Sequence, residues 1–310
     1  MIGNTKHTIA VIGHIVRDRI VNPGGQKVDA LGGIAYNLTA LAAMIVDAGR
    51  VIPVCNIGYD LYNQAIEFFS RFPAIDFSKA KKIPRNNKIH ELRYSDTDYR
   101  EEINIGEMPM ITPRLFLSCR KLDVALINYI GGDEFPPRHI RWLKRQFSPL
   151  IYMDYHSLAL GRIKIDKDGQ RVKRYFRYNP HWREYVELAD IVQMNHIELQ
   201  SIMPETENET ESIISSALKV RERGPMAVII TREEKDIVVI AGNRDKPVAH
   251  ILPVKPVEKV VDPTGCGDSF AAGFISSYIY SRDILKACNK GLYLAIRKAG
   301  FSGLAGFIER

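Results

Sequence analysis

The sequence predicts an α/β fold built around a mainly parallel β-sheet. Runs of β-branched and apolar residues alternate with segments of helical periodicity along most of the chain, which is the pattern of successive β-α-β units. The composition agrees, because the chain has 310 residues of which 45% are hydrophobic and 25% charged. Such a chain can form one large core or about two domains, and it is neither disordered, collagen-like nor a small disulfide scaffold.

Strands are expected wherever short β-branched runs occur. The first run, TIAVIG, lies close to the N-terminus at 8–13. The complete set of expected core strands spans 8–13, 51–57, 124–129, 150–154, 191–194 and 227–231.

Helices are expected between these strands because apolar residues recur there at helical spacing. The first contains the apolar run 38–46, and the Glu-rich segment 205–209 precedes a later one, where the helix macrodipole favours negative charge. The expected helices span 35–48, 62–71, 138–147, 210–223, 269–281 and 283–299.

Two regions interrupt the alternation and are typical of antiparallel ribbons. In the first, 18–21 combines with 88–94 and 99–105, and the last two are joined by the turn-forming residues 95–98. We expect a small sheet to project from the core there. The second is a hairpin over 162–175 with Asp-Gly in its turn. We interpret it as an insertion that makes a surface or subunit contact.

Charge and cysteine content limit the classes of partner. Lys and Arg number 43 against 36 Asp and Glu, which gives a formal net charge of +7. This excess attracts an anionic ligand such as a nucleotide but does not require nucleic acid. The basic stretch 79–85 has no interleaved aromatic residues and is expected to be a solvated loop. The four cysteines form no C-x-x-C pair, so neither a zinc site nor a disulfide framework is expected.

No segment predicts a membrane span or a secretory signal. Residues 1–7 are polar and lead directly into the first expected strand. Apolar stretches such as 38–46 fall well short of the roughly 18 to 20 residues that a spanning helix needs. We therefore expect no membrane partner and a cytoplasmic location.

The strongest chemical signal is the segment 260–274, which reads VVDPTGCGDSFAAGF. Gly265 and Gly267 flank Cys266, and a helical pattern of small apolar residues follows. Glycine lets a ligand approach the backbone, and the first amides of a helix lack intrahelical partners, so this segment can bind an anion. Asp268 would repel that anion, which suggests that its carboxylate meets a proton-bearing group as a general base. The structural alternative is a simple bend with Asp268 as a helix cap.

Two further motifs contain polar groups at places where ligands bind. Asn195 and Glu198 follow the expected strand 191–194, and ligands of open α/β sheets bind at the carboxyl ends of strands. Oxygen ligands of this kind suit Mg²⁺, usually through retained waters. Near the N-terminus, Gly32-Gly33 precedes Asn37 at the start of an apolar helix, where a small polar molecule could approach closely. A loop followed by a first helical turn is the alternative there.

In order and spacing, these motifs resemble those of the ribokinase-like (PfkB) family of carbohydrate and nucleoside kinases. The correspondence covers nearly the whole chain, and the D-x-T-G-C-G-D segment over 262–268 is its most specific part. The resemblance implies a three-layer α/β/α core in a single domain over 1–310, with a small β lid formed by about 14–30 and 86–108. It also implies ATP as phosphate donor and a hydroxyl group as acceptor.

Roles for individual residues follow from the same resemblance. Asp268 would be the general base, and the backbone amides of Gly265, Cys266 and Gly267 would hold the charge that develops on the phosphoryl oxygens. Asn195 and Glu198 would orient Mg²⁺ through its waters. The acceptor would be held by Asp18, Gly32, Gly33 and Asn37. The nucleotide site would include Thr231, Thr264 and Gly267, and Asp262 and Thr264 match positions near a bound monovalent cation such as K⁺.

One segment departs from the family pattern. Relatives commonly have a T-x-G-x-x-G nucleotide loop, whereas this chain reads TREEKD over 231–236, with both glycines replaced. Thr231 is retained, but Glu233 and Asp236 would crowd or repel a nucleotide. The resemblance also allows pairing of two copies through the lid.

The sequence does not identify the acceptor. We expect a sugar or sugar-like molecule, with a nucleoside as the alternative and a non-catalytic sugar or nucleotide sensor of the same fold as a further alternative. Walker A, H-E-x-x-H, G-x-S-x-G and G-x-G-x-x-G motifs are absent from the sequence, which argues against P-loop, zinc protease, hydrolase and dehydrogenase chemistry.

Overall fold

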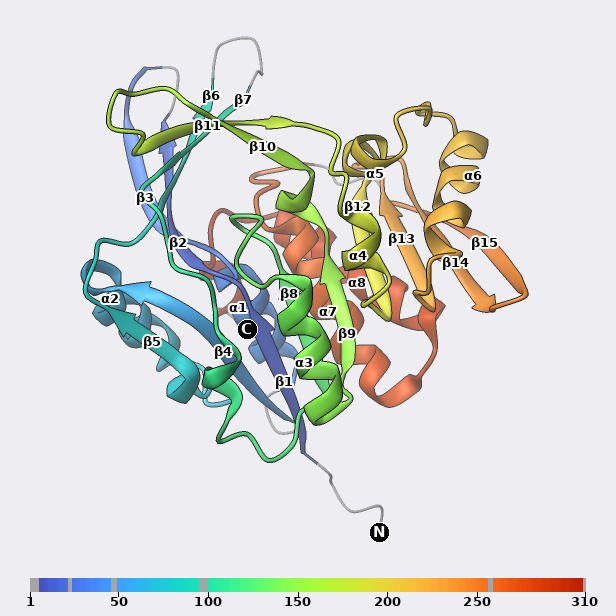
Figure 1. Ribbon diagram of the computed structural model, residues 1–310, viewed down its shortest axis with the longest axis horizontal. Helices are drawn as coiled ribbons and strands as arrows, with labels where there is room; N and C mark the ends of the chain where they lie inside the picture. The colour runs from blue at the N-terminus through green and yellow to red at the C-terminus, as the bar shows by residue number, and fades with distance from the viewer. Residues whose placement is uncertain (1–5, 22–23, 46–48, 95–99, 256–258, 309–310) are drawn as a thin grey trace.

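A computed structural model describes residues 6–21, 24–45, 49–94, 100–255 and 259–308. A nine-stranded sheet forms the core and runs in the order β15-β14-β13-β12-β9-β8-β1-β4-β5 (Figure 1). Neighbouring strands from β13 to β5 are parallel, and β14 and β15 complete one edge as an antiparallel hairpin. The expected mainly parallel sheet is confirmed. Its strands are β1 (His7–Ile12), β4 (Gly49–Gly58), β5 (Ala80–Ile83), β8 (Val124–Asn128), β9 (Leu150–Asp154), β12 (Ile191–Asn195), β13 (Ala227–Thr231), β14 (Asp236–Asn243) and β15 (Lys246–Pro253).

Helices cover both faces of this sheet and make three layers. The helices are α1 (Ala35–Met44), α2 (Tyr59–Phe69), α3 (Pro137–Phe147), α4 (Trp182–Val186), α5 (His196–Ile202), α6 (Thr210–Arg221), α7 (Cys266–Ser281) and α8 (Ile284–Ala299). Residues of α1, α2, α7 and α8 join one buried cluster, and residues of α3, α4, α5 and α6 join the other. Strand β1 serves both, because Ile9 and Val11 enter the first cluster while Ala10 and Ile12 enter the second.

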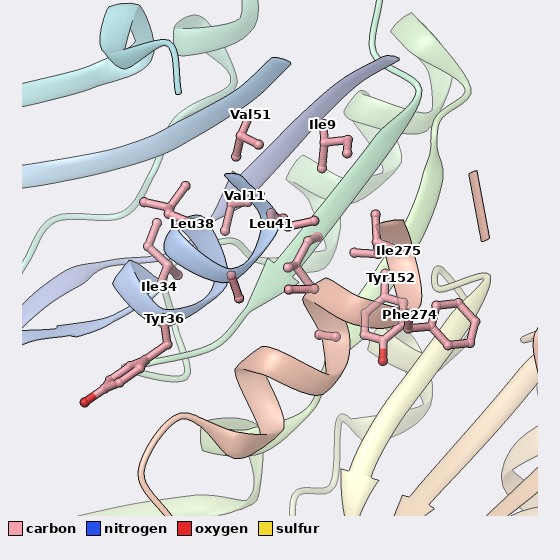
Figure 2. Packing of buried hydrophobic residues seen from close by; sticks show 14 of the residues in the cluster. Ile9, Val11, Ile34, Tyr36, Leu38, Leu41, Val51, Tyr152, Phe274 and Ile275 are labelled. Atoms are coloured by element: carbon pink, nitrogen blue, oxygen red, sulfur yellow. The ribbon is translucent and has the colours of Figure 1, made fainter. Parts of the chain in front are cut away.

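The first cluster fixes α1 and α7 against the sheet. Figure 2 shows Leu38 and Leu41 of α1 beside Val11 of β1, with Phe274 and Ile275 of α7 on the neighbouring part of the sheet. All of these side chains are fully buried. Truncation of one such residue to alanine typically costs about 2 to 5 kcal/mol, so the start of α7 is held by a rigid base.

A second, six-stranded sheet projects from the core in the order β10-β11-β7-β6-β2-β3 (Figure 1). Three of its strands correspond to the ribbon strands expected at 18–21, 88–94 and 99–105, although residue 99 lies outside the described residues. It also includes the hairpin over 162–175, which the sequence predicts as an insertion, because β11 pairs with β7 in the same sheet. The bounds are β2 (Ile15–Val21), β3 (Lys27–Gly33), β6 (Ile89–Tyr94), β7 (Arg100–Ile105), β10 (Leu160–Lys164) and β11 (Arg171–Phe176). The expected turn at 95–98 lies outside the described residues.

Some expectations were wrong in detail. The stretch 79–85 is not a solvated loop, because Ala80–Ile83 pairs in parallel with β4 at the edge of the main sheet. Its exposed lysines are usual on an edge strand, where they discourage further pairing. The helix expected over 35–48 ends at Met44, and 46–48 lie outside the described residues. Within the part of the chain that is described, no helix combines the length and apolar character needed to cross a membrane.

Candidate active site

Polar side chains gather where several core strands end and α7 begins. Asn128 is the last residue of β8, Asp154 of β9 and Asn195 of β12, and these parallel strands are neighbours in the sheet. Their carboxyl ends therefore meet at one edge. Ligands of open α/β sheets bind at this edge.

The N-terminus of α7 has the backbone geometry that the glycine motif predicts. Gly265 precedes the helix in the left-handed conformation, with φ of 84°, and a Cβ there would lie 2.3 Å from the ring of Tyr36. Only glycine fits this position without strain. Among the described residues, no acceptor bonds the amides of Gly265 and Gly267, whereas the amide of Cys266 donates to the carbonyl of Pro263 at 3.2 Å. Two of the three amides named from the sequence are thus open to an anion.

Asp268 is fixed by two asparagines from other elements. Its Oδ1 accepts a hydrogen bond of 2.5 Å from Nδ2 of Asn128, and its main-chain oxygen accepts one of 3.1 Å from Nδ2 of Asn37. Asn128 also donates to Oδ1 of Asn37 at 2.8 Å, which closes the network. Among the described residues, no other residue donates a hydrogen bond to Oδ2 of Asp268, while the backbone N–H of Asp268 itself interacts with this carboxylate. Oδ2 can therefore still accept a proton from a ligand.

The surroundings of Asp268 suit a base that works near neutral pH. Burial raises the pKa of Asp268 to about 6, with a further increase from Asp18, while His156 and the hydrogen bond from Asn128 act in the opposite direction. A carboxylate with this pKa is ionised at pH 7 and is a stronger proton acceptor than an exposed one. Asp268 lies in the first turn of α7, so the open amides and this carboxylate share one location.

Asn195 and Glu198 form a capping box at the start of α5. The amide of Glu198 donates to Oδ1 of Asn195 at 2.8 Å, and the amide of Asn195 donates to Oε2 of Glu198 at 2.8 Å. Oε1 of Glu198 accepts from Nδ2 of Asn195 at 3.0 Å and lies 3.3 Å from Nδ1 of His156. The motif therefore has a structural role in addition to any ligand that it holds.

These contacts decide how Mg²⁺ would fit. Glu198 is 4% exposed, and most of its acceptor positions are already used, although Oε2 retains a free lone pair. Across the described ranges, no group of three or more His, Cys, Asp or Glu side chains is arranged to hold a metal ion directly. Contact through water molecules is the mode that these residues fit.

His156 and Asp154 add charge to the same edge. Burial disfavours the charged ring, but the hydrogen bond to Glu198 and the charges of Glu198 and Asp154 outweigh it and raise the pKa of His156 to about 9. Burial, with the charge of Glu198, raises the pKa of Asp154 well above its usual value. The protonated His156 therefore balances carboxylates that would otherwise repel one another.

Three side chains of the second sheet form a row that we call the acceptor row: Asp18, His90 and Asn104. They occupy directly opposed positions on β2, β6 and β7, so they share one face of this sheet. Nδ1 of His90 lies 3.6 Å from Oδ1 of Asp18. Both polar atoms of the Asn104 side chain are buried without a hydrogen-bond partner among the described residues. Buried polar atoms are seldom left unpaired, so the row has hydrogen-bonding groups that a polar ligand or water could use.

The double glycine makes room beside the acceptor row. A Cβ at Gly32 would lie 2.0 Å from the carboxylate of Asp18, and Gly33, with φ of 62°, would meet the carbonyl of His14 at 2.2 Å. The structure thus brings Asp18, Gly32 and Gly33 together. Asn37 lies elsewhere, in the Asp268 network, so it connects Asp268 to α1.

In the altered loop over 231–236, one of the two acidic side chains expected to repel a nucleotide is neutralised by a neighbouring arginine. Asp236 pairs with the guanidinium of Arg232, which also donates to Oγ1 of Thr210 at 2.9 Å. Glu233 is exposed and adopts a left-handed φ of 51°, which is the conformation that a glycine would favour. Thr231 ends β13, next to Asn195 at the end of β12.

Asp262 is engaged by the protein itself. Oδ1 accepts from the amide of Thr264 at 2.9 Å, Oδ2 accepts from the amide of Gly303 at 3.0 Å, and Oδ2 lies 3.4 Å from Nζ of Lys298. The hydroxyl of Thr264 is buried without a partner among the described residues. These bonds tie the segment before α7 to the segment after α8.

Sequence reasoning did not find Asn128, Asp154 or Lys298. The first two are single polar residues at or near the ends of expected strands, and this position is a usable signal because ligands of open α/β sheets bind at the carboxyl ends of strands. Nothing in the sequence around Lys298 distinguishes it from other lysines near a helix C-terminus.

An open amide pair beside a carboxylate at the edge of an α/β core can bind a phosphoryl group and accept the proton of a hydroxyl, as phosphoryl transfer to a hydroxyl requires. Comparisons with known proteins agree. Residues 166–304 match the model of the pfkB family carbohydrate kinases. The nucleoside kinase of Methanocaldococcus jannaschii is 40% identical over 298 residues, which cover 92% of this chain and 87% of that protein. The cytidine kinase of Thermococcus kodakarensis is 27% identical over 292 residues, or 92% and 93% of the two chains.

A solved structure supports the fold. The ribokinase of Thermotoga maritima superposes with a TM-score of 0.71 at 18% identity, covering 97% of this chain and 95% of that one. The chain belongs to the pfkB family. It is accordingly a phosphotransferase that acts on a hydroxyl group.

Proposed function

We propose that this chain is an ATP-dependent nucleoside kinase with Asp268 as its general base. The observation that carries the proposal is the position of Asp268, fixed by Asn128 beside the open amides at the start of α7. A base and an anion site in one place are what phosphoryl transfer to a hydroxyl requires.

The choice of a nucleoside departs from the sugar that we expected from the sequence. Two relatives that match over most of their length are named cytidine kinase and nucleoside kinase. The acceptor row could also bind groups other than the hydroxyls of a sugar. The side-chain amide of Asn104 has no partner among the described residues, and it can both donate and accept hydrogen bonds. Such a group can read the polar edge of a base while Asp18 accepts from ribose hydroxyls.

In the proposed reaction, Oδ2 of Asp268 takes the proton of the acceptor hydroxyl as its oxygen bonds to the γ-phosphorus. The bond from that phosphorus to the bridging oxygen breaks, and ADP leaves with the electron pair. The amides of Gly265 and Gly267 donate to the phosphoryl oxygens, where one preorganised donor is worth about 3 kcal/mol. Bound Mg²⁺ would supply charge neutralisation, with Glu198 and Asn195 holding its waters.

In this proposal, the second sheet acts as a lid over the active site. It carries the acceptor row, and its strands come from segments far apart in the chain, at 15–21, 27–33, 89–94, 100–105, 160–164 and 171–176. Closure of this sheet over the site would exclude water that could otherwise attack ATP. Asn37 would act by holding Asp268 and Asn128 in position.

The test is an ADP-release assay with Mg²⁺ and ATP across nucleosides and free sugars. We expect turnover with at least one pyrimidine or purine nucleoside and little with free ribose or hexoses. Asp245, which is exposed in the β14–β15 turn, provides the matched control: Asp245→Asn should retain activity that Asp268→Asn loses. Turnover of sugars alone would refute the nucleoside assignment, and nucleoside binding without turnover would refute the proposed reaction.

We also propose that two copies pair through the second sheet. Its hairpin exposes large apolar side chains, with Ile163 at 52% and Tyr175 at 42% exposure on one face. Sedimentation equilibrium of the chain and of an Ile163→Glu variant tests this proposal, because a dimer through this face should dissociate in the variant. A monomer at all concentrations would contradict it.

A further inference from the structure

The side chain of Lys298 is completely buried. It lies in the last turn of α8, and its exposed fraction is 0%. An ammonium group removed from water is unfavourable unless several polar groups surround it. The surroundings of this nitrogen therefore show what it does.

Oxygen atoms and aromatic faces enclose the ammonium group. Nζ donates to the carbonyl oxygens of Phe301 at 3.0 Å and Asp262 at 3.2 Å, and it lies 3.4 Å from Oδ2 of Asp262. The rings of Phe301 and Tyr36 lie 5.1 and 5.7 Å away. A lysine has three N–H donors, and three oxygens accept here. Main-chain carbonyls with one carboxylate are also the donor set that binds a monovalent cation.

This enclosure supports the backbone of the candidate anion site. Asp262, which contacts the ammonium through two oxygens, accepts the amide of Thr264 immediately before Gly265. The ring of Tyr36 that faces Lys298 also fills the space beneath Gly265. The ammonium thus contacts residues that in turn contact the backbone at the start of α7, and it does not reach the open amides itself.

The residues present do not fit K⁺ at Asp262. The family resemblance places a monovalent cation near this carboxylate, but the ammonium of Lys298 already takes its Oδ2 and its main-chain oxygen. A second cation bound to the same oxygens would lie next to that charge in a buried setting, where like charges repel strongly. The amide of Gly303 uses Oδ2 as well.

We propose that Lys298 is a built-in replacement for the monovalent cation, so that this kinase is organised without K⁺. Lys298 is a positioning residue: it acts on the anion site through Asp262 and Tyr36. The expectation that catalysis does not need K⁺ rests on the proposed kinase function. The expectation that K⁺ does not stabilise the folded chain is independent of that function. The two can therefore fail separately.

The first experiment uses the unaltered chain in KCl, NaCl and tetramethylammonium chloride at equal ionic strength. Thermal unfolding should give the same midpoint in all three salts, and the ADP-release rate should agree within about twofold, which is under about 0.5 kcal/mol. A midpoint or rate raised selectively by KCl would overturn the proposal. If no acceptor supports turnover, the unfolding midpoints still decide it.

The second experiment removes the ammonium with Lys298→Ala and uses Lys286→Ala, exposed on the same helix, as the control. We expect Lys298→Ala to lose activity by about 10- to 100-fold, the scale for loss of a group that orients a binding site. K⁺ or NH₄⁺, but not tetramethylammonium, should restore part of the rate and raise the unfolding midpoint. A folded variant with full activity and no salt preference would refute the positioning role. If the variant does not fold, the first experiment decides.

Discussion

Replacing Asp268 with asparagine should stabilise the protein in a pH-dependent way. Burial raises the pKa of this carboxyl from 3.8 to about 6 in the folded chain. Between these values the folded state binds more protons than the unfolded state, so this group stabilises the protein below about pH 4. That stabilisation is lost as the pH rises through about 6.

The size of the effect follows from the two pKa values. A difference of about 2 pH units corresponds to about 3 kcal/mol, and partial exposure of the side chain makes this an upper figure. Asparagine at this position would keep the size of the side chain and could still accept from Asn128. About a third of the stabilisation is already lost at pH 4.5, which leaves up to about 2 kcal/mol. The free energy of unfolding of Asp268→Asn, relative to the unaltered chain, should increase by this amount between pH 4.5 and pH 8.

Urea unfolding of both proteins across this pH range measures the difference directly. The matched control is Asp245→Asn, whose exposed side chain should give a difference that does not depend on pH. A difference for Asp268→Asn that is constant, or that decreases toward pH 8, would refute the electrostatic account of this site.

Three further outcomes follow from the geometry of the same region. The kcat/KM profile should fall on the acid side near pH 6, where Asp268 becomes protonated. His156→Gln should move this acid limb to higher pH, because a positive charge that lowers the pKa of Asp268 is lost. An acid limb that does not move would contradict the electrostatic effect of His156 on Asp268. Glu233→Gly should raise the free energy of unfolding by about 1 kcal/mol, because a left-handed conformation is unfavourable for glutamate, and chemical denaturation checks this. Gly265→Ala should lower stability by about 2 kcal/mol or more and reduce turnover at least tenfold, since its Cβ would meet a ring at 2.3 Å. Gly106→Ala, with a similar φ of 77° and open space around it, should show only the smaller backbone effect.

The core could be predicted from the sequence because its strands are buried on both faces and lie between periodic helices. The edges could not be predicted in the same way. Strand β5 has exposed lysines and reads as a loop, and β14 and β15 form a hairpin that breaks the β-α alternation. Whether such a segment forms a strand depends on a pairing partner far away in the sequence. The hairpin of β10 and β11 is an example, because β11 pairs with β7.

The candidate site was predictable only where local sequence carries the chemistry. The glycines and aspartate at the start of α7 act through backbone conformation that is encoded within a few residues. Asn128 and Lys298 act through side chains that reach other elements, over 140 residues to Asp268 and 36 residues to Asp262. Local pattern cannot reveal such contacts, because the tertiary structure creates them.

The most direct measurement of the central claim is the single-turnover rate of phosphoryl transfer from ATP to a nucleoside acceptor, with acceptor affinity measured separately. Asp268→Asn should reduce this rate about a hundredfold or more, on the scale of general-base loss, while nucleoside affinity changes little. Transfer at an undiminished rate in that variant would contradict the assignment of Asp268 as the base.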